Sequence, residues 1–110
     1  IYSDSRSKSF LKKGYSLNKI RFALAKKGID SKYIKSSISK IKENESDPDF
    51  FSAIKICKRR RIGPIREEGN RSIFYKKDIS ILARSGFSYE ISKKVLELPK
   101  EEFKQFCKMI

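Results

Sequence analysis

The sequence FLKKGYSLNKIRFALAKKGID, residues 10–30, contains the motif on which the predicted fold depends. Gly14-Tyr15-Ser16 and Gly28-Ile29-Asp30 share the order glycine, apolar residue, Ser or Asp, and Gly86-Phe87-Ser88 repeats this order later in the chain. A left-handed glycine ends one helix, and the Ser or Asp oxygen accepts hydrogen bonds from the first amides of the next helix. The apolar residue between them acts as a hydrophobic staple. Three such helix-to-helix joints predict tandem helical repeats.

Apolar residues outside the joints recur at helical spacing, as in the set Leu17, Ile20 and Leu24. Asp47-Pro48 is typical of a helix start, with Asp47 as the N-cap and proline at the first helical position. No stretch shows a sustained alternation of polar and apolar residues, which argues against a sheet. We therefore predict an all-α fold with about six or seven helices.

The length of 110 residues fits a single domain. We predict that this domain consists of two three-helix repeats, at about residues 1–44 and 45–110, which together form an elongated helical array. An exposed loop is expected at residues 63–71, and a helix from about residue 72 to residue 84. Because the sequence begins with Ile1 rather than Met, we expect that it is a fragment or that further residues precede it.

The charge balance indicates a polyanionic partner. Lysine and arginine total 27 against 13 acidic residues, which gives a formal net charge of +14. Such an excess repels itself in a compact chain and attracts polyanions. Nucleic acid is the first candidate and an anionic membrane surface the second, but no apolar run approaches the roughly 18 residues of a membrane span. We therefore expect nucleic acid and no membrane.

Two stretches without any acidic residue, residues 6–28 and 54–66, concentrate this charge. Solvated helices usually mix charges, because pairs of opposite sign one turn apart stabilise a helix and like pairs destabilise it. We predict a binding surface for phosphates or for an acidic protein groove. The alternative is structural, since cations near a helix C-terminus complement the helix dipole. The candidate binding residues in these stretches are Lys12, Lys13, Lys19, Arg21, Lys26, Lys27, Lys55, Lys58, Arg59, Arg60, Arg61 and Arg66.

The residue types needed for common catalytic sites are missing. The chain has no histidine, which excludes His-containing zinc sites and His-based triads. Its two cysteines, Cys57 and Cys107, lie among apolar residues and are expected to be buried, with a disulfide as the alternative. The acidic pairs Asp47/Asp49 and Glu67/Glu68 are explained by cap and loop positions. We expect no enzyme activity, no cofactor and no metal.

The joints and their surroundings resemble the RecX family, whose members are bacterial regulators of the RecA recombinase. Residues 10–30 are similar to the second RecX repeat, and Asp47 together with LARSGFSYEI, residues 82–91, is similar to the third. The order and spacing of these motifs over roughly residues 2–98 are more specific than any one of them. Two joints depart from the family pattern. Ser16-Leu17 stands where the family usually has Gly-Pro, and Ser85 stands at the second basic position of an Arg-Arg-Gly-Phe joint.

The resemblance implies a fold and a function. RecX proteins are elongated arrays of three-helix repeats that lodge in the groove of the RecA filament on DNA and modulate, most often inhibit, its strand exchange, ATP hydrolysis and coprotease activity. This implies a regulator in DNA repair and the SOS response, in the bacterial cytoplasm. We expect a monomer whose partners are RecA, its nucleoprotein filament and, weakly and without sequence preference, DNA. Arg84 joins the candidate contacts, and the family's first repeat is expected to lie upstream.

A second interpretation stays open, namely a small DNA-binding protein of the helix-turn-helix kind, with its turn at residues 25–29. A recognition helix needs Asn, Gln or Arg along one exposed face to contact base edges. The faces expected to be exposed here are rich in lysine, which contacts phosphate but specifies sequence poorly. The filament regulator is therefore the leading hypothesis.

Overall fold

The computed structural model describes residues 2–110, and this range contains eight α-helices, one 3-10 helix and no strand. The predicted all-α fold class is confirmed. In chain order the elements are α1 (Tyr2–Lys12), α2 (Leu17–Lys26), α3 (Ser31–Asn44), α4 (Pro48–Arg60), η1 (Gly63–Ile65), α5 (Glu68–Ile73), α6 (Tyr75–Arg84), α7 (Tyr89–Leu96) and α8 (Lys100–Met109).

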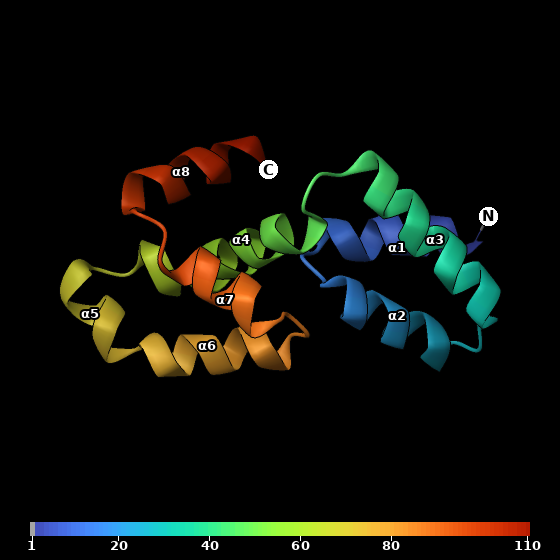
Figure 1. Ribbon diagram of the computed structural model, residues 1–110, viewed down its shortest axis with the longest axis horizontal. Coiled ribbons are helices and arrows are strands. Elements are labelled where there is room, and N and C mark those ends of the chain that lie inside the picture. The colour runs from blue at the N-terminus through green and yellow to red at the C-terminus, as the bar shows by residue number, and fades with distance from the viewer. Residues whose placement is uncertain (1) are drawn as a thin grey trace.

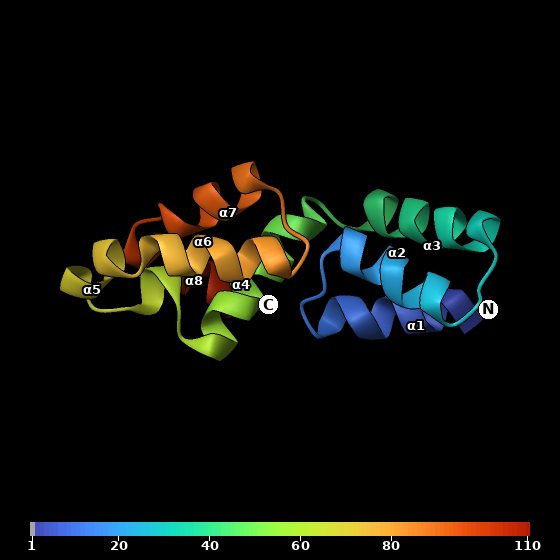
Figure 2. The same ribbon diagram turned by 90° about the horizontal axis from the view of Figure 1, so that it is seen from below.

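The helices form two groups that lie end to end along a molecule measuring 46 × 25 × 20 Å (Figures 1 and 2). Helices α1, α2 and α3 all contact one another in the first group. In the second group, α4 contacts α7 and α8, and α6 and α7 form a helical hairpin. The two groups meet where α1 contacts α4. The array is elongated, as predicted.

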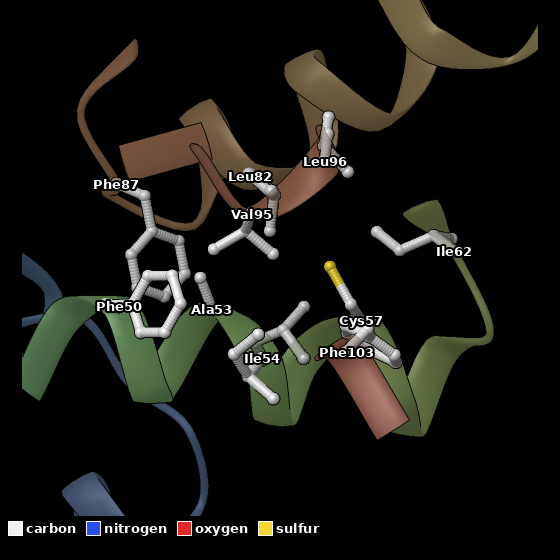
Figure 3. Close-up of a cluster of buried hydrophobic side chains, with 11 residues drawn as sticks. Phe50, Ala53, Ile54, Cys57, Ile62, Leu82, Phe87, Val95, Leu96 and Phe103 are labelled. Carbon is white, nitrogen blue, oxygen red and sulfur yellow. The ribbon is translucent and has the colours of Figure 1, made fainter. Parts of the chain in front are cut away.

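Each group has its own hydrophobic core. Figure 3 shows the second core, where Cys57 and Ile54 of α4 face Val95 of α7 and Phe103 of α8. Removing a large aliphatic or aromatic side chain from water contributes about 1.5–3 kcal/mol to folding, so these clusters are the main stabilising feature of each group. The first core consists of Phe10, Leu17, Ile20, Leu24, Ile34, Ile38 and Ile41.

The three predicted joints have the geometry that the sequence pattern predicts. Their glycines adopt φ angles between +78° and +93°. The residue after each glycine donates its amide hydrogen to the carbonyl five positions earlier, at N···O distances of 3.1–3.2 Å. The side chains of Ser16, Asp30 and Ser88 then accept a hydrogen bond from an amide in the first turn of the next helix, at 3.0–3.1 Å.

A fourth helix ends in the same way without glycine. Arg61 adopts the left-handed conformation after α4, with φ 56°, and the amide of Ile62 donates to the carbonyl oxygen of Cys57 at 3.0 Å. The sequence did not indicate this joint, because a left-handed residue other than glycine is uncommon.

The start of α4 differs in part from the prediction. Pro48 takes the first helical position as expected, but the carboxylate of Asp47 makes no capping hydrogen bond. Asp47 is left-handed, with φ 46° and ψ 59°, whereas a capping side chain normally requires an extended backbone. Asp47 therefore stands at the N-cap position, as predicted, but its side chain does not cap the helix.

The loop expected at residues 63–71 is not a loop. It contains η1 and most of α5, so that the helices number eight rather than six or seven, and the helix predicted from residue 72 is divided at Phe74. Two polar anchors give this segment its shape. The buried carboxylate of Asp78 accepts the amide hydrogen of Gly63 at 2.9 Å, and Arg71 donates to the carbonyl oxygens of Leu96 and Leu98 at 2.8 and 2.7 Å. Both contacts join residues distant in the sequence, and local propensity does not reveal them.

Candidate nucleic-acid interface

The two acid-free stretches meet at the contact between α1 and α4. The carbonyl groups at the end of α1 have no partners within that helix, as at any helix C-terminus. The ammonium group of Lys55 donates to the carbonyl oxygen of Leu11 at 3.2 Å, and Nη1 of Arg59 donates to that of Lys13 at 2.7 Å. These two cations therefore hold the helical groups together, which gives part of the second stretch a structural role.

Around this contact, three open hollows adjoin one another. The central hollow, about 1070 Å³, lies between the end of α1, the outer side of α4 and the end of α8. It shares Lys12 and Lys55 with a hollow of about 540 Å³ beside α1, and it shares Lys58 with one of about 370 Å³ beside α8. Because of these shared residues, the three hollows adjoin one another along α1, α4 and α8.

The lining of these hollows is strongly cationic. Nine lysine and arginine residues line them, against two carboxylates, Glu45 and Glu101. The ammonium group of Lys104 lies 3.8 Å from Glu101, a weak contact at the surface. A concave surface with such an excess of one charge concentrates the field that attracts a polyanion. We call this surface the cationic trough; its nine cations are Lys8, Lys12, Lys55, Lys58, Arg59, Arg61, Lys100, Lys104 and Lys108.

Apolar side chains lie among these cations in every hollow. Phe51 lines the central hollow, Leu11 the hollow beside α1, and Ile65 and Phe103 the hollow beside α8. The ring of Phe51 is supported from within by the edge-on ring of Phe106, at a centroid distance of 5.8 Å. The trough therefore combines positive charge with apolar and aromatic surface.

The trough brings together five of the predicted binding residues, namely Lys12, Lys55, Lys58, Arg59 and Arg61. Seven others are exposed but lie outside it. Four of these, Lys19, Arg21, Lys26 and Lys27, belong to α2 or its C-terminal end, below α1 in Figure 1, and the remaining three are Lys13, Arg60 and Arg84.

The cations of α2 have local partners. The ammonium groups of Lys19 and Lys26 lie 4.2 Å from the ring of Tyr15 and 5.6 Å from that of Phe22. Nη1 of Arg21 donates to the side-chain oxygen of Asn18 at 2.9 Å. The α2 face is thus a second basic surface, separate from the trough.

Arg66 has a structural position, contrary to the expectation of a phosphate contact in an exposed loop. Its Nε and Nη2 donate to the two carboxylate oxygens of Asp78 at 2.8 and 2.9 Å, and its guanidinium lies 4.3 Å from the centre of the Phe74 ring. The hydrogen bonds to Asp78 raise the pKa of Arg66. With 18% of its side chain exposed, Arg66 stays bound to Asp78 and is a poor phosphate ligand.

Four trough residues were not among the predicted contacts. Lys8 lies in the first acid-free stretch, while Lys100, Lys104 and Lys108 lie on α8. The signal for the last three was present, because residues four apart share one helix face. Glutamates in the first turn of α8 obscured it, since they suggested only a favourable helix start.

The described residues show no arrangement typical of catalysis. Cys57 and Cys107 are both free thiols, and burial, followed by the nearby charge of Asp78, raises the pKa of Cys57 to about 12. Within residues 2–110, no three His, Cys, Asp or Glu side chains are grouped closely enough to hold a metal ion. None of the helices in this range is long and apolar enough to cross a membrane.

The chain is similar to the regulatory protein RecX of Myxococcus xanthus (strain DK1622). The two sequences are 31% identical over 98 residues, which cover 87% of this chain and 51% of that RecX. The chain thus spans about half the length of this relative. No family model matches the chain, and no solved structure matches it significantly. The likeness to RecX supports the resemblance of the joints, and the assignment of individual repeats stays a prediction.

Proposed function

We propose that this chain belongs to the RecX family and is a non-enzymatic regulator that binds the RecA–DNA filament and inhibits it in DNA repair and the SOS response. The observation that carries the proposal is the cationic trough, which brings cations from both acid-free stretches onto one surface. The likeness to a protein named as regulatory RecX supports it. We propose further that the chain acts as a monomer in the bacterial cytoplasm.

The shape of the molecule is suited to a filament. Basic residues extend from α1 across α4 to α8, and the α2 face adds a second basic surface. A filament groove offers protein and phosphate contacts over a long path, so the binding energy is spread over many modest interactions. Single substitutions should therefore have small effects, whereas reversal of several charges should abolish binding.

Co-sedimentation with RecA filaments on single-stranded DNA, against the same DNA without RecA, tests this function. We expect the chain to sediment with the filament and to inhibit its ATP hydrolysis at fixed salt. Reversal of Lys19, Arg21 and Lys26 to glutamate, or of Lys12, Lys58 and Lys108, should abolish both effects while helicity is retained. If the unaltered chain inhibits ATP hydrolysis and both variants inhibit it equally well, the basic surfaces are only solvated faces and the proposal is wrong.

The helix-turn-helix alternative is less favoured by the side chains of α3, the helix that would follow the turn and read the bases. Helix α3 contains no Arg or Gln, and its single Asn, Asn44, is its last residue. Competition between random duplexes and duplexes selected for binding separates the two interpretations, because only a sequence-reading protein prefers the selected duplexes.

A further inference from the structure

We propose that the cationic trough is a binding site for single-stranded nucleic acid, and that the α2 face is not part of that site. This inference rests on the proposed function for its biological meaning. It concerns the chain alone, however, and so it can be tested without RecA.

The distribution of charge in the trough favours a polymer with one negative charge in each unit. All three hollows contain lysine, and the cations come from three helices that lie far apart in the sequence. Along α4, Lys58 and Arg59 follow Lys55 by three and four residues, so each lies on the same side of the helix as Lys55. A phosphodiester backbone supplies charges at regular intervals and can contact all of these cations, whereas an acidic peptide would need carboxylates at matching positions.

The apolar lining favours a single strand over a duplex. Each hollow exposes an apolar side chain between its cations, and Phe51 contributes an aromatic ring to the largest one. Unpaired bases can stack on such surfaces, and base–aromatic stacking tolerates any sequence. In a duplex the bases are stacked inside, and only phosphates and groove edges reach the protein. Proteins that bind single strands without sequence preference combine a positive groove with apolar and aromatic platforms in this way.

The α2 face also places cations beside aromatic rings, but it does not line the trough. Its cations contact the rings of Tyr15 and Phe22 or the amide of Asn18, and none of its residues lines the trough. Phe22 protrudes from α2 and is 66% exposed. It lines none of the three hollows that form the trough. The α2 face therefore serves as the matched comparison in the experiment.

The experiment measures binding of an oligothymidylate of about 12 nucleotides to the full chain by fluorescence anisotropy, without RecA. One variant carries Lys12→Glu, Lys58→Glu and Lys108→Glu, and the other carries Lys19→Glu, Arg21→Glu and Lys26→Glu. Both lose the same net charge. The three trough lysines have exposed side chains that form no ion pair among residues 2–110, so folding should be retained. Circular dichroism and melting temperature check this. If the trough variant fails to fold, Lys12→Gln with Lys58→Gln replaces it, against Lys19→Gln with Lys26→Gln.

We expect the trough variant to lose affinity by about tenfold or more and the α2 variant by less than about threefold. An abasic oligomer and a duplex of equal length should both bind the unaltered chain more weakly than oligothymidylate. Equal losses in the two variants would show binding by net charge alone and would overturn the inference. Displacement of the oligomer by polyglutamate at equal charge concentration would do the same, because it would identify the trough as an acidic-protein site. If the chain binds oligothymidylate but does not inhibit RecA, this inference stands and the proposed function is wrong.

Discussion

At the scale of single residues, Asp78 stands out as a buried carboxylate held by three hydrogen bonds. Its side chain is 1% exposed, and its two oxygens accept hydrogen bonds from the amide of Gly63 and from two nitrogens of Arg66. A buried carboxylate is tolerated only when such partners compensate for the loss of water. Asp78 thereby ties the segment after α4 to α6.

Replacement of Asp78 by asparagine should destabilise the fold by about 2–3 kcal/mol, because it leaves the guanidinium of Arg66 without its charged partner. Urea unfolding measures the change. Glu67→Gln is the matched control, since Glu67 is exposed and caps no helix with its side chain, and it should change stability by less than about 0.5 kcal/mol. Similar effects of the two substitutions would contradict the role assigned to Asp78.

The thiol of Cys57 makes stability depend on pH at the alkaline end. Burial raises its pKa to about 12 in the folded chain, while an exposed thiol ionises near pH 8.5. Above that value the unfolded state binds fewer protons than the native state, so the free energy of unfolding should fall as pH rises toward 12. Cys57→Ser should flatten this dependence in unfolding curves taken from about pH 8 to 10. An unchanged slope would exclude Cys57 as its source.

At the scale of elements, the first and third joints lie against each other. The hydroxyl of Ser16 donates to the carbonyl oxygen of Ser85 at 2.9 Å and accepts the amide hydrogen of Lys19 at 3.0 Å. Ser16 and Ser85 are two of the three residues at which the chain departs from the RecX pattern, and the structure brings them into contact. A Cβ atom on Gly86 would collide with the Ser16 hydroxyl oxygen.

Alanine substitutions separate conformational strain from this close approach. Gly28 is left-handed and has open space around it, so Gly28→Ala should cost about 1 kcal/mol. Gly86→Ala should cost more, because it adds displacement of Ser16 to the same strain. Combining Gly86→Ala with Ser16→Gly should recover the additional loss of stability, because it removes the hydroxyl group with which the new Cβ collides. Melting temperatures test the series, and equal costs at Gly28 and Gly86 would show that the two joints do not touch in solution.

At the scale of the whole molecule, the net charge of +14 makes the affinity for nucleic acid depend on salt. Each phosphate that a lysine or arginine neutralises releases counterions from the nucleic acid. If about five phosphates of a single strand are neutralised, log affinity plotted against log salt should have a slope near −3.5. Titrations of oligothymidylate at several salt concentrations provide the slope. An affinity independent of salt would rule out an electrostatic mechanism.

Much of the fold could be predicted because its determinants are local. The joints depend on a left-handed glycine and a capping oxygen within a few residues, and the apolar stripes depend on helical periodicity. These signals indicated the all-α class, the ends of α1, α2 and α6, and the positive charge of the outer faces. They failed at Arg61, where an arginine takes the left-handed position, and at residues 63–71, where contacts from α6 and α7 shape the chain.

The site depended on tertiary structure because a surface is made of residues that only folding brings together. The trough joins Lys12 to Lys108 across three helices, and it leaves the equally basic α2 outside. The same contacts turn Arg66 from a free cation into the partner of Asp78. Local sequence thus specified the helices, their joints and their net charge, whereas the packing of α8 and of the end of α1 against α4 decided which charges share one concave surface.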